Sequence, residues 1–468
     1  MPSVKVNPSF FQNILKALPI IAAFFLQSIP TFHGIYYLRT DFQEKPMLYY
    51  IIRPIVRFAL KLFYRKIHLS NLDNIPKGKP VILAANHPTA FMEPCILACF
   101  QKRGLFYIVR GDIFANKFYA RILGSLHMLP IYRKKDRGYK FIKQNYSTFS
   151  TCYQTLANKR TVMILAEGTT EHEKRLRPLV KGTARIAFGT LDEFPDIEDV
   201  YIVPVGVNYT YADQFRSEVY IDFGEPISTR SFEQLYRENA NQGINDLTKL
   251  LQEKMFPGVI HIENEEDEDV LEKLFRLDRS KQTFRPFPVV SMDSTPLKRE
   301  KRLADFVNQL SAGTKEKLKE AVNDHFELLR ESGLANCRKF EKKGNSFVLF
   351  LLLAVLFPVF FVGYIFGYVP MWHARFVTNR RVRDITFRSS ILMAVGVVGW
   401  LIWLVLLIII TLTFKAWYLL VLPVFSIVAM YYLDVFDSWN CNRRLKGLSA
   451  EQRESISKSE KELDKLLH

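Results

Sequence analysis

Three stretches near the C-terminal end of this chain contain no charged side chain, and they restrict its fold more than any other feature. They cover residues 346–369, 389–414 and 416–433. A helix that crosses a bilayer needs about 20 predominantly apolar residues. The second and third stretches therefore predict two membrane spans joined by a tight turn at Lys415. On this basis the chain is expected to be an integral membrane protein.

The first stretch, residues 346–369, favours a different arrangement. Basic residues flank it on both sides, within 338–343 and 375–388, and positive flanks prefer the cytoplasm. A full span would place these two flanks on opposite sides of the membrane. A re-entrant hairpin broken at Pro358 would keep both inside. We therefore predict a membrane module of residues 346–435 that contains this hairpin, followed by a cytoplasmic tail, 436–468.

The first 65 residues predict amphipathic helices that lie on the membrane surface. Arg53, Arg57, Lys61 and Arg65 recur every four residues among apolar neighbours, which places a basic stripe beside an apolar face, as interfacial helices have. A helix packed on the rest of the domain, with a solvated basic side, is the alternative. The net charge of +17 favours an anionic partner. Because this charge flanks apolar stretches, we expect a lipid bilayer and phosphorylated substrates, and no nucleic acid.

Residues 66–231 alternate short apolar runs with longer mixed segments. The runs that predict buried strands are 80–85, 104–109, 161–166 and 200–207. Helical segments are expected between them. This alternation predicts an α/β domain in which helices flank a mostly parallel sheet. The next segment, 232–345, is rich in charge and is expected to be a mainly helical connector.

The chain has five cysteines, and no two of them have CxxC spacing. An odd number of scattered cysteines argues against a disulfide framework and against a zinc site. The same pattern fits a reducing compartment. No metal site is therefore predicted.

One apolar run, "VILAANHPTAFMEPCILA" (81–98), ends in a polar turn that holds Asn86 and His87. Open α/β sheets bind ligands beyond the carboxyl ends of their strands, and imidazole is a common general base near neutral pH. Glu93 lies on the next expected helix, where a carboxylate could fix the tautomer of the imidazole. Taken alone, the stretch fits a structural histidine better than a catalytic one.

Further polar groups follow other predicted strands, in positions where a phosphate could bind. The block Glu167-Gly168-Thr169 follows the strand predicted at 161–166, and Gly182 opens the next helix. The basic residues of these segments are Arg133, Arg175, Arg177 and Lys181. A guanidinium and an ammonium that converge at a helix start suit a phosphate group.

With these blocks taken together, the chain resembles the glycerophospholipid acyltransferases of the lysophosphatidic acid and glycerol-3-phosphate acyltransferase superfamily. Four blocks carry the resemblance, in the family's order: "AANHPTAFMEP", "GSLHMLPIYR", "AEGTTEHEKRLRPLVKGTARIA" and "IVPVGVNY". They fall within about residues 66–230, which is under half of the chain.

The resemblance implies acyl transfer without a covalent acyl-enzyme, in phospholipid synthesis. His87 would take the proton from a glycerol hydroxyl, Glu93 would orient His87, and the alkoxide would attack an acyl thioester. Arg133 and Lys181 would hold the acceptor phosphate. The other residues expected to form the substrate site are Asn86, Glu167, Gly168, Thr169, Arg177 and Gly182. No metal or bound cofactor is implied, because the thioester of coenzyme A or acyl-carrier protein is a co-substrate.

Three positions depart from the family's pattern, and one of them is Ala166, where the family usually has a proline. The acid is Glu93, one residue later than the usual aspartate, and Met92 occupies the usual position. Thr170 stands where the family's EGTR block has its arginine, and Arg175 or Arg177 is expected to replace that arginine.

The leading prediction is a membrane-bound acyltransferase whose catalytic domain faces the cytoplasm. Its acceptor would be glycerol-3-phosphate or 1-acylglycerol-3-phosphate, and its product phosphatidic acid or the precursor of phosphatidic acid. One alternative is an O-acyltransferase that acts on lysophospholipids or amino-acid lipids. The other is a catalytically inactive relative that binds lipid as a scaffold.

Overall fold

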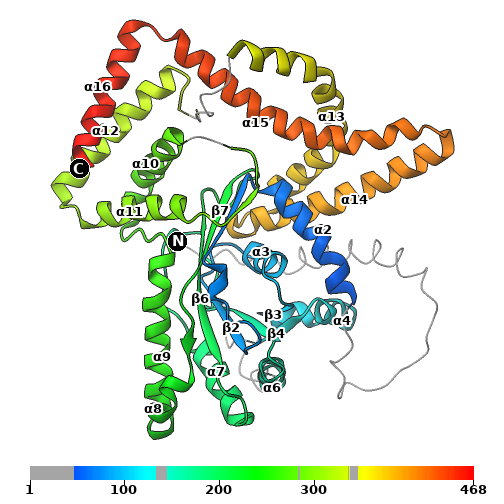
Figure 1. The fold of residues 1–468 in the computed structure, drawn as a ribbon, viewed down its shortest axis with the longest axis vertical. Helices are drawn as coiled ribbons and strands as arrows, with labels where there is room; N and C mark the ends of the chain where they lie inside the picture. Colours follow the sequence, from blue (N-terminus) through cyan, green and yellow to red (C-terminus); the bar gives the residue numbers. More distant parts are fainter. Residues whose placement is uncertain (1–46, 133–144, 283–284, 336, 338–345, 468) are drawn as a thin grey trace.

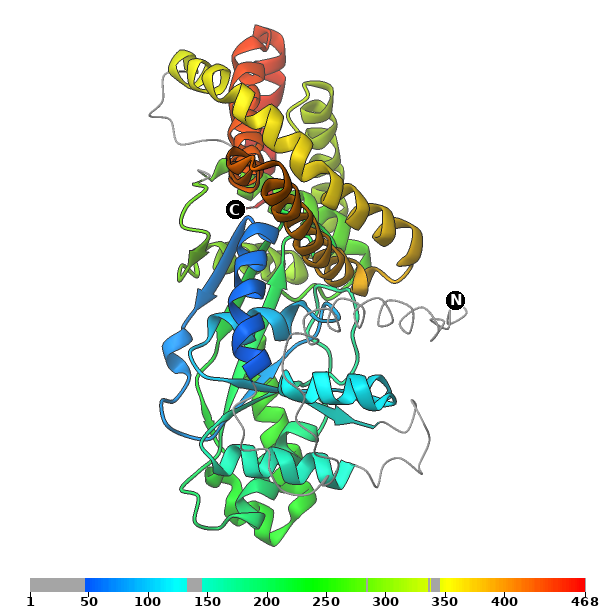
Figure 2. The same ribbon diagram turned by 90° about the vertical axis from the view of Figure 1, so that its right-hand side faces the viewer.

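The computed structural model describes residues 47–132, 145–282, 285–335, 337 and 346–467 (Figure 1). Most of the predicted N-terminal surface helices, and Arg133, therefore lie outside the described residues. The described part contains a sheet domain, a helical connector and three long apolar helices. Figure 2 shows the sheet domain in the lower half of the molecule and the long helices above it.

The sheet follows the order β4-β3-β5-β2-β6-β7-β1-β9. Its strands are β1 (Lys66–Ser70), β2 (Val81–Ala85), β3 (Leu105–Arg110), β4 (Met128–Ile131), β5 (Thr161–Leu165), β6 (Tyr201–Tyr209), β7 (Glu218–Phe223) and β9 (Val290–Ser291). All neighbours on this path are parallel except β6 and β7, and the short β8 (Ile227–Ser228) pairs antiparallel to β6. The predicted strands correspond to β2, β3, β5 and β6, so the mostly parallel α/β sheet is confirmed.

Helices cover both faces of this sheet. Successive residues of a strand point to opposite faces, and the apolar side chains on each face pack against helices. The helices of the domain are α2 (Met47–Phe63), α3 (Met92–Phe100), α4 (Lys117–Ser125), α6 (Asn145–Ala157) and α7 (Gly182–Glu193). In β2, Val81, Leu83 and Ala85 join a core with α2 and α3, whereas Ile82 and Ala84 join a second core with α6, α7 and α9 (Ala240–Met255). The carboxyl end of β2 is thus held between two packed layers.

The connector is mainly helical, as predicted. Besides α9 it contains α8 (Glu233–Glu238), α10 (Glu268–Lys281), α11 (Thr295–Gln309) and α12 (Ala312–Glu331). A third core joins α10, α11 and α12 to Leu463 of α16 (Ala450–Leu466). The predicted boundary at 435/436 is wrong, because α15 (Leu422–Gly447) runs across it and the tail packs back on the connector.

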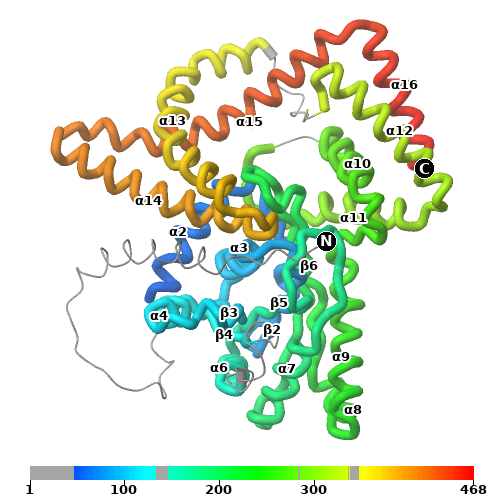
Figure 3. Tube along the Cα trace, turned by 180° about the vertical axis from the view of Figure 1, so that it is seen from behind, coloured from blue at the N-terminus to red at the C-terminus, as the bar shows by residue number. Residues whose placement is uncertain are grey.

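Three helices are long and apolar enough to cross a membrane among the described residues: α13 (Ser346–Arg381), α14 (Arg388–Phe414) and α15. The last two correspond to the predicted spans. The predicted break at Pro358 is wrong, because α13 continues through this proline as one helix, which curves along its length in Figure 3. A proline removes one backbone donor and bends a helix, but ending the helix in lipid would leave several backbone groups unpaired.

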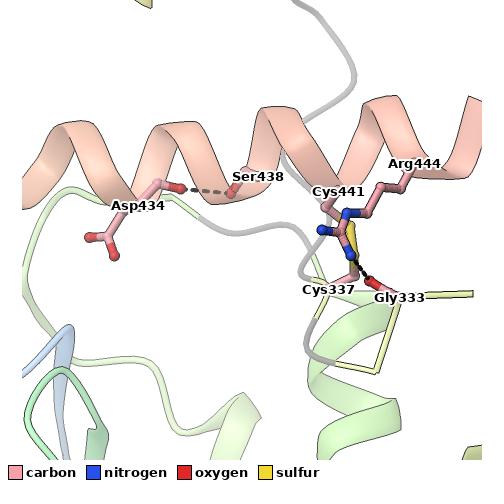
Figure 4. The surroundings of a disulfide bond; sticks show 6 residues. All are labelled: Gly333, Cys337, Asp434, Ser438, Cys441 and Arg444. Atoms are coloured by element: carbon pink, nitrogen blue, oxygen red, sulfur yellow. Dashed lines mark hydrogen bonds between the residues drawn. A yellow bond between two sulfur atoms is a disulfide. The ribbon is translucent and has the colours of Figure 1, made fainter. Parts of the chain in front are cut away.

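A disulfide joins Cys337, which follows α12, to Cys441 in α15 (Figure 4). The argument from the sequence against disulfides is wrong for this pair. The two cysteines are 104 residues apart in the chain, so only the packing of the connector against α15 brings them together. Arg444 on the same helix donates a hydrogen bond to the Gly333 carbonyl at 2.9 Å, which adds a second contact at this junction.

A buried ion-pair cluster fastens α15 to the sheet domain. Asp434 accepts hydrogen bonds from Arg65, at 3.0 Å, and from Arg216. The Asp434 side chain is only 5% exposed. A buried carboxylate is stable only when paired, so this cluster fixes the position of α15 against the domain.

Candidate active site

The turn after β2 brings His87 to the carboxyl edge of the sheet. Asn86 holds this turn against β6, because its side chain donates to the Val207 carbonyl at 3.0 Å and accepts from the Val207 N–H at 2.7 Å. The backbone N–H of His87 donates to Glu167 beyond β5 at 2.8 Å. Three adjacent strands therefore fix the position of the histidine. Since both polar groups of the Asn86 amide are engaged with the backbone, its role is to support the turn.

The imidazole of His87 faces the carboxylate of Glu93, at 3.7 Å between Nδ1 and Oε2. Both side chains are buried, and the other oxygen of Glu93 accepts from the Thr89 N–H at 2.7 Å. His87 Nδ1 and Glu93 Oε2 have no hydrogen-bond partner among the described residues. A small closure of the turn would join them directly.

The shifted position of the acid is compatible with this geometry. Helix α3 begins at Met92, whose fully buried side chain joins the core, while Glu93 turns towards the histidine. The longer side chain of glutamate brings its carboxylate to 3.7 Å from the imidazole. The structure thus brings together the two residues that the sequence proposed as a dyad.

Two tyrosines near Glu93 were not identified from the sequence. The rings of Tyr64, which follows α2, and Tyr209, the last residue of β6, stack with centroids 6.1 Å apart. Burial raises the pKa of both hydroxyls well above the usual range, and the charge of Glu93 raises them further. Both remain neutral phenols beside a buried acid. The signal for Tyr209 was its place at the end of the "IVPVGVNY" strand.

The block Glu167-Gly168-Thr169 forms a braced loop at the end of β5. Glu167 is buried and accepts from the Arg177 backbone at 2.9 Å and from its guanidinium at 2.5 Å. The same guanidinium donates to the hydroxyl and to the carbonyl of Thr169, both at 2.6 Å. Arg177 therefore supports the loop, and its contact with the acceptor phosphate stays a prediction.

Gly168 permits the backbone of this loop. Its φ is +70°, a region that L-residues with a side chain rarely adopt. A Cβ at this position would also lie 3.2 Å from Val180. Since the Val180 N–H donates to the Ala166 carbonyl at 2.8 Å, Lys181 and Gly182 start α7 beside the end of β5.

The remaining basic candidates differ in availability. The side chain of Lys181 is exposed. Arg175 instead donates to the backbone carbonyls of Ile262 and Glu263, at 3.1 and 2.9 Å, so it anchors the connector. Arg133 lies outside the described residues.

A cavity of about 360 Å³ opens beside the histidine turn. Asn86 and Pro88 line it from the turn, His172 lines it from the loop after β5, and α10 of the connector contributes charged residues of both signs. Burial lowers the pKa of His172, so its neutral form is favoured there. Such mixed walls suit a small polar molecule. The described residues contain no group of three or more His, Cys, Asp or Glu side chains placed to hold a metal.

Comparison with known proteins identifies the same region of the chain. Residues 66–208 match the family model described as Acyltransferase. Two Saccharomyces cerevisiae proteins are similar: Glycerol-3-phosphate O-acyltransferase 1, 39% identical over 75 residues, and Glycerol-3-phosphate O-acyltransferase 2, 29% identical over 128 residues. These matches cover 16% and 27% of this chain, but only 10% and 17% of those relatives.

Among solved structures, the chain is similar to the 1-acyl-sn-glycerophosphate acyltransferase PlsC from Thermotoga maritima. The two are 19% identical with a TM-score of 0.33, and the alignment covers 53% of this chain and 93% of that one.

Proposed function

We propose that this chain, whose residues 66–208 match the Acyltransferase family model, transfers a fatty acyl group from an acyl thioester to a hydroxyl of a phosphorylated glycerol. Glycerol-3-phosphate is the favoured acceptor, with 1-acylglycerol-3-phosphate as the second choice. Two observations support this order: both yeast relatives are glycerol-3-phosphate O-acyltransferases, and the cavity beside the histidine turn has mixed polar walls.

One observation carries the proposal: a histidine at the carboxyl edge of the sheet faces a fully buried carboxylate. With Nδ1 directed at Glu93, the other ring nitrogen, Nε2, is left to act on a substrate. An acid on one nitrogen selects the tautomer in which the opposite nitrogen is a base. This arrangement suits removal of a proton from an alcohol.

The proposed reaction is a single acyl transfer. His87 Nε2 takes the proton of the acceptor hydroxyl as its oxygen attacks the thioester carbonyl. The tetrahedral intermediate then collapses, the C–S bond breaks, and the departing thiolate receives a proton from the imidazolium. An ester and a free thiol result, and His87 returns to its neutral form. Glu93 is a positioning residue that stabilises the imidazolium between the two steps.

The mechanism needs no metal or bound cofactor, because the acyl thioester already carries an activated carbonyl. Acyl-CoA or acyl-carrier protein would be the co-substrate. Glu167 and Arg177 serve the reaction indirectly, since they fix the backbone of His87 and the shape of the adjacent loop.

The membrane supplies the acyl chain's surroundings. Besides α13–α15, helix α2 exposes Tyr50, Ile51, Ile55 and Phe58, an apolar face that suits the lipid interface. We propose that the domain lies on the cytoplasmic side, with this face against the bilayer. The basic residues at the α13–α14 junction, which contacts the histidine turn, prefer that side.

Purified protein in nanodiscs, supplied with labelled acyl thioesters and a panel of acceptors, tests the proposal. We expect transfer to glycerol-3-phosphate and a loss of at least about 10³-fold in kcat for His87→Ala, as for removal of an essential base. His325→Ala is the matched control, because His325 is also buried but lies on α12.

Equal loss in both variants would point to unfolding, which a thermal melt would reveal. Unchanged kcat in correctly folded His87→Ala protein would refute the mechanism. Folded wild-type protein that transfers acyl groups to no acceptor would favour a lipid-binding scaffold instead.

A further inference from the structure

The membrane helices contact the histidine turn directly. The Ala90 N–H donates to the Thr386 carbonyl at 2.9 Å, and the Phe91 N–H donates to the Ser390 hydroxyl at 3.1 Å. Thr386 lies in the short connection between α13 and α14, and Ser390 in the first turn of α14. Figure 3 shows this junction of the long helices beside α3. The turn that carries His87 is therefore in direct contact with the membrane module.

A second cavity, of about 470 Å³, lies at this junction. The loop after β6 lines it through Asp213, and the membrane helices line it through Arg375, Asn379 and Arg388. Asp213 also lines the cavity beside His87, so the two cavities adjoin. One water occupies about 30 Å³ in the liquid, which leaves ample room here for a small phosphorylated molecule.

Positive charge dominates the walls of the second cavity. Arg388 donates to the Asn379 side chain at 3.0 Å and approaches the Asp213 carboxylate only to 3.8 Å. Arg375 is exposed in the cavity and forms no hydrogen bond or ion pair with the described part of the chain. Two guanidinium groups, one of them unengaged, suit a phosphate, which arginine binds through paired N–H donors.

The loop that normally supplies a phosphate ligand does not provide a free one here. Thr170 occupies the position of the arginine in the EGTR block. Arg177 donates to Glu167 and Thr169, and Arg175 donates to backbone carbonyls of the connector. The membrane helices bring two further guanidiniums, Arg375 and Arg388, to the cavity that shares Asp213 with the one beside the histidine turn.

We propose that Arg375 and Arg388 bind the phosphomonoester of the acyl acceptor, which makes the membrane module part of the active site. This inference rests on the proposed function and specifies which residues recognise the acceptor. The Asp213 carboxylate lies 3.8 Å from the Arg388 guanidinium, and a doubly charged phosphate displaces it. A soluble glycerol phosphate and the headgroup of a membrane lysolipid share this chemistry.

Three substitutions test the assignment: Arg375→Gln, Arg388→Gln and Arg388→Lys. Loss of a charge-assisted hydrogen bond should raise the KM for glycerol-3-phosphate about ten-fold or more, while the KM for the acyl thioester stays the same. Arg388→Lys should recover part of the loss. The control is Arg380→Gln, which removes an arginine of the same helix that lies over Phe376, outside the cavity.

The source of the phosphate is decided by comparing acceptors. An effect on soluble glycerol-3-phosphate alone assigns the site to the free acceptor, and an effect on vesicle-borne 1-acylglycerol-3-phosphate alone assigns it to a lipid headgroup. Glycerol, which lacks the phosphate, should be used equally poorly by wild type and variants.

Direct titration of glycerol-3-phosphate into solubilised protein keeps the assignment testable if no turnover occurs. The Kd should rise about ten-fold in Arg375→Gln, which has no packing role to disturb. Wild-type activity together with unchanged KM and Kd in both glutamine variants would overturn the inference and leave acyl transfer standing. Absence of transfer with an intact, arginine-dependent Kd would instead remove the proposed function alone.

Discussion

The substitution Glu93→Gln isolates the electrostatic role of the buried acid. Glutamine has the size of glutamate, and its carbonyl oxygen can still accept from the Thr89 N–H, which Glu93 now does at 2.7 Å. The fold of the turn should therefore survive. What disappears is the negative charge that faces the His87 imidazole during proton transfer.

The magnitude follows from the separation of 3.7 Å between His87 Nδ1 and Glu93 Oε2. At an effective dielectric constant of about 20, two unit charges at this distance attract by about 4 kcal/mol. Each 1.36 kcal/mol of barrier corresponds to about ten-fold in rate. We therefore expect kcat to fall about 10³-fold in Glu93→Gln, with little change in the KM for either substrate.

The assay is steady-state transfer of a labelled acyl group to glycerol-3-phosphate, with a thermal melt to verify folding. Glu93→Asp is the informative companion, because it keeps the charge and withdraws it by about 1.5 Å. The same Coulomb estimate then gives a loss of only about ten-fold. A folded Glu93→Gln variant that keeps more than about a tenth of the wild-type kcat would refute the dyad, and His87 would act without this acid.

Three further predictions concern the framework of the site. Asp434→Ala removes the acid that holds Arg65 and Arg216 between α15 and the sheet domain. It should cost about 3–5 kcal/mol of stability and speed proteolysis at this junction. The control Asp437→Ala, at an exposed position, should change neither the stability nor the rate of proteolysis. Burial lowers the pKa of His127 to about 4 from an ordinary value of about 6.5, so the unfolded chain binds the proton first as the pH falls. About 3 kcal/mol of stability present above pH 6.5 should therefore disappear between pH 6.5 and 4. Denaturant titrations of His127→Gln should lack this loss. Gly168→Ala should reduce kcat and cost about 1–2 kcal/mol of stability for its positive φ. Gly78→Ala, with φ of +71° and no neighbour within 4 Å of the added Cβ, should cost stability but leave kcat intact. Equal kcat losses in both variants would contradict the role of the Glu167–Thr169 loop.

The sheet could be predicted from the sequence because its strands are apolar on both faces. Every residue of β2 is buried, since parallel strands covered by helices on both sides have no polar face. Such strands appear in the sequence as continuous apolar runs, each followed by the turn that carries a polar group. The placement of His87 and Glu167 at strand ends follows from this order. That β2 and β5 are neighbours in the sheet does not, because β3 and β4 lie between them in the chain.

The functions of individual polar groups could not be predicted in the same way. Arg177 and Arg175 have the composition of phosphate ligands, but their donors are used by Glu167, Thr169 and the connector. Which acceptor a guanidinium finds depends on the path of the loop. Tyr64 reaches Glu93 only because α2 packs across the same face as α3, a contact with no local signature.

The membrane module illustrates the same limit on a larger scale, and it also indicates why the module is more than an anchor. Its apolar helices are evident from composition, but its contact with the turn at Ala90 and Phe91 is not. A backbone donor buried without a partner costs about 1–3 kcal/mol, and the N–H groups of these two residues are satisfied by Thr386 and Ser390. Without the module, two donors within four residues of His87 would need other partners. The shape of the histidine turn therefore depends on the helices in the membrane, and a change in how α13 and α14 sit in the bilayer would reach the base that removes the proton.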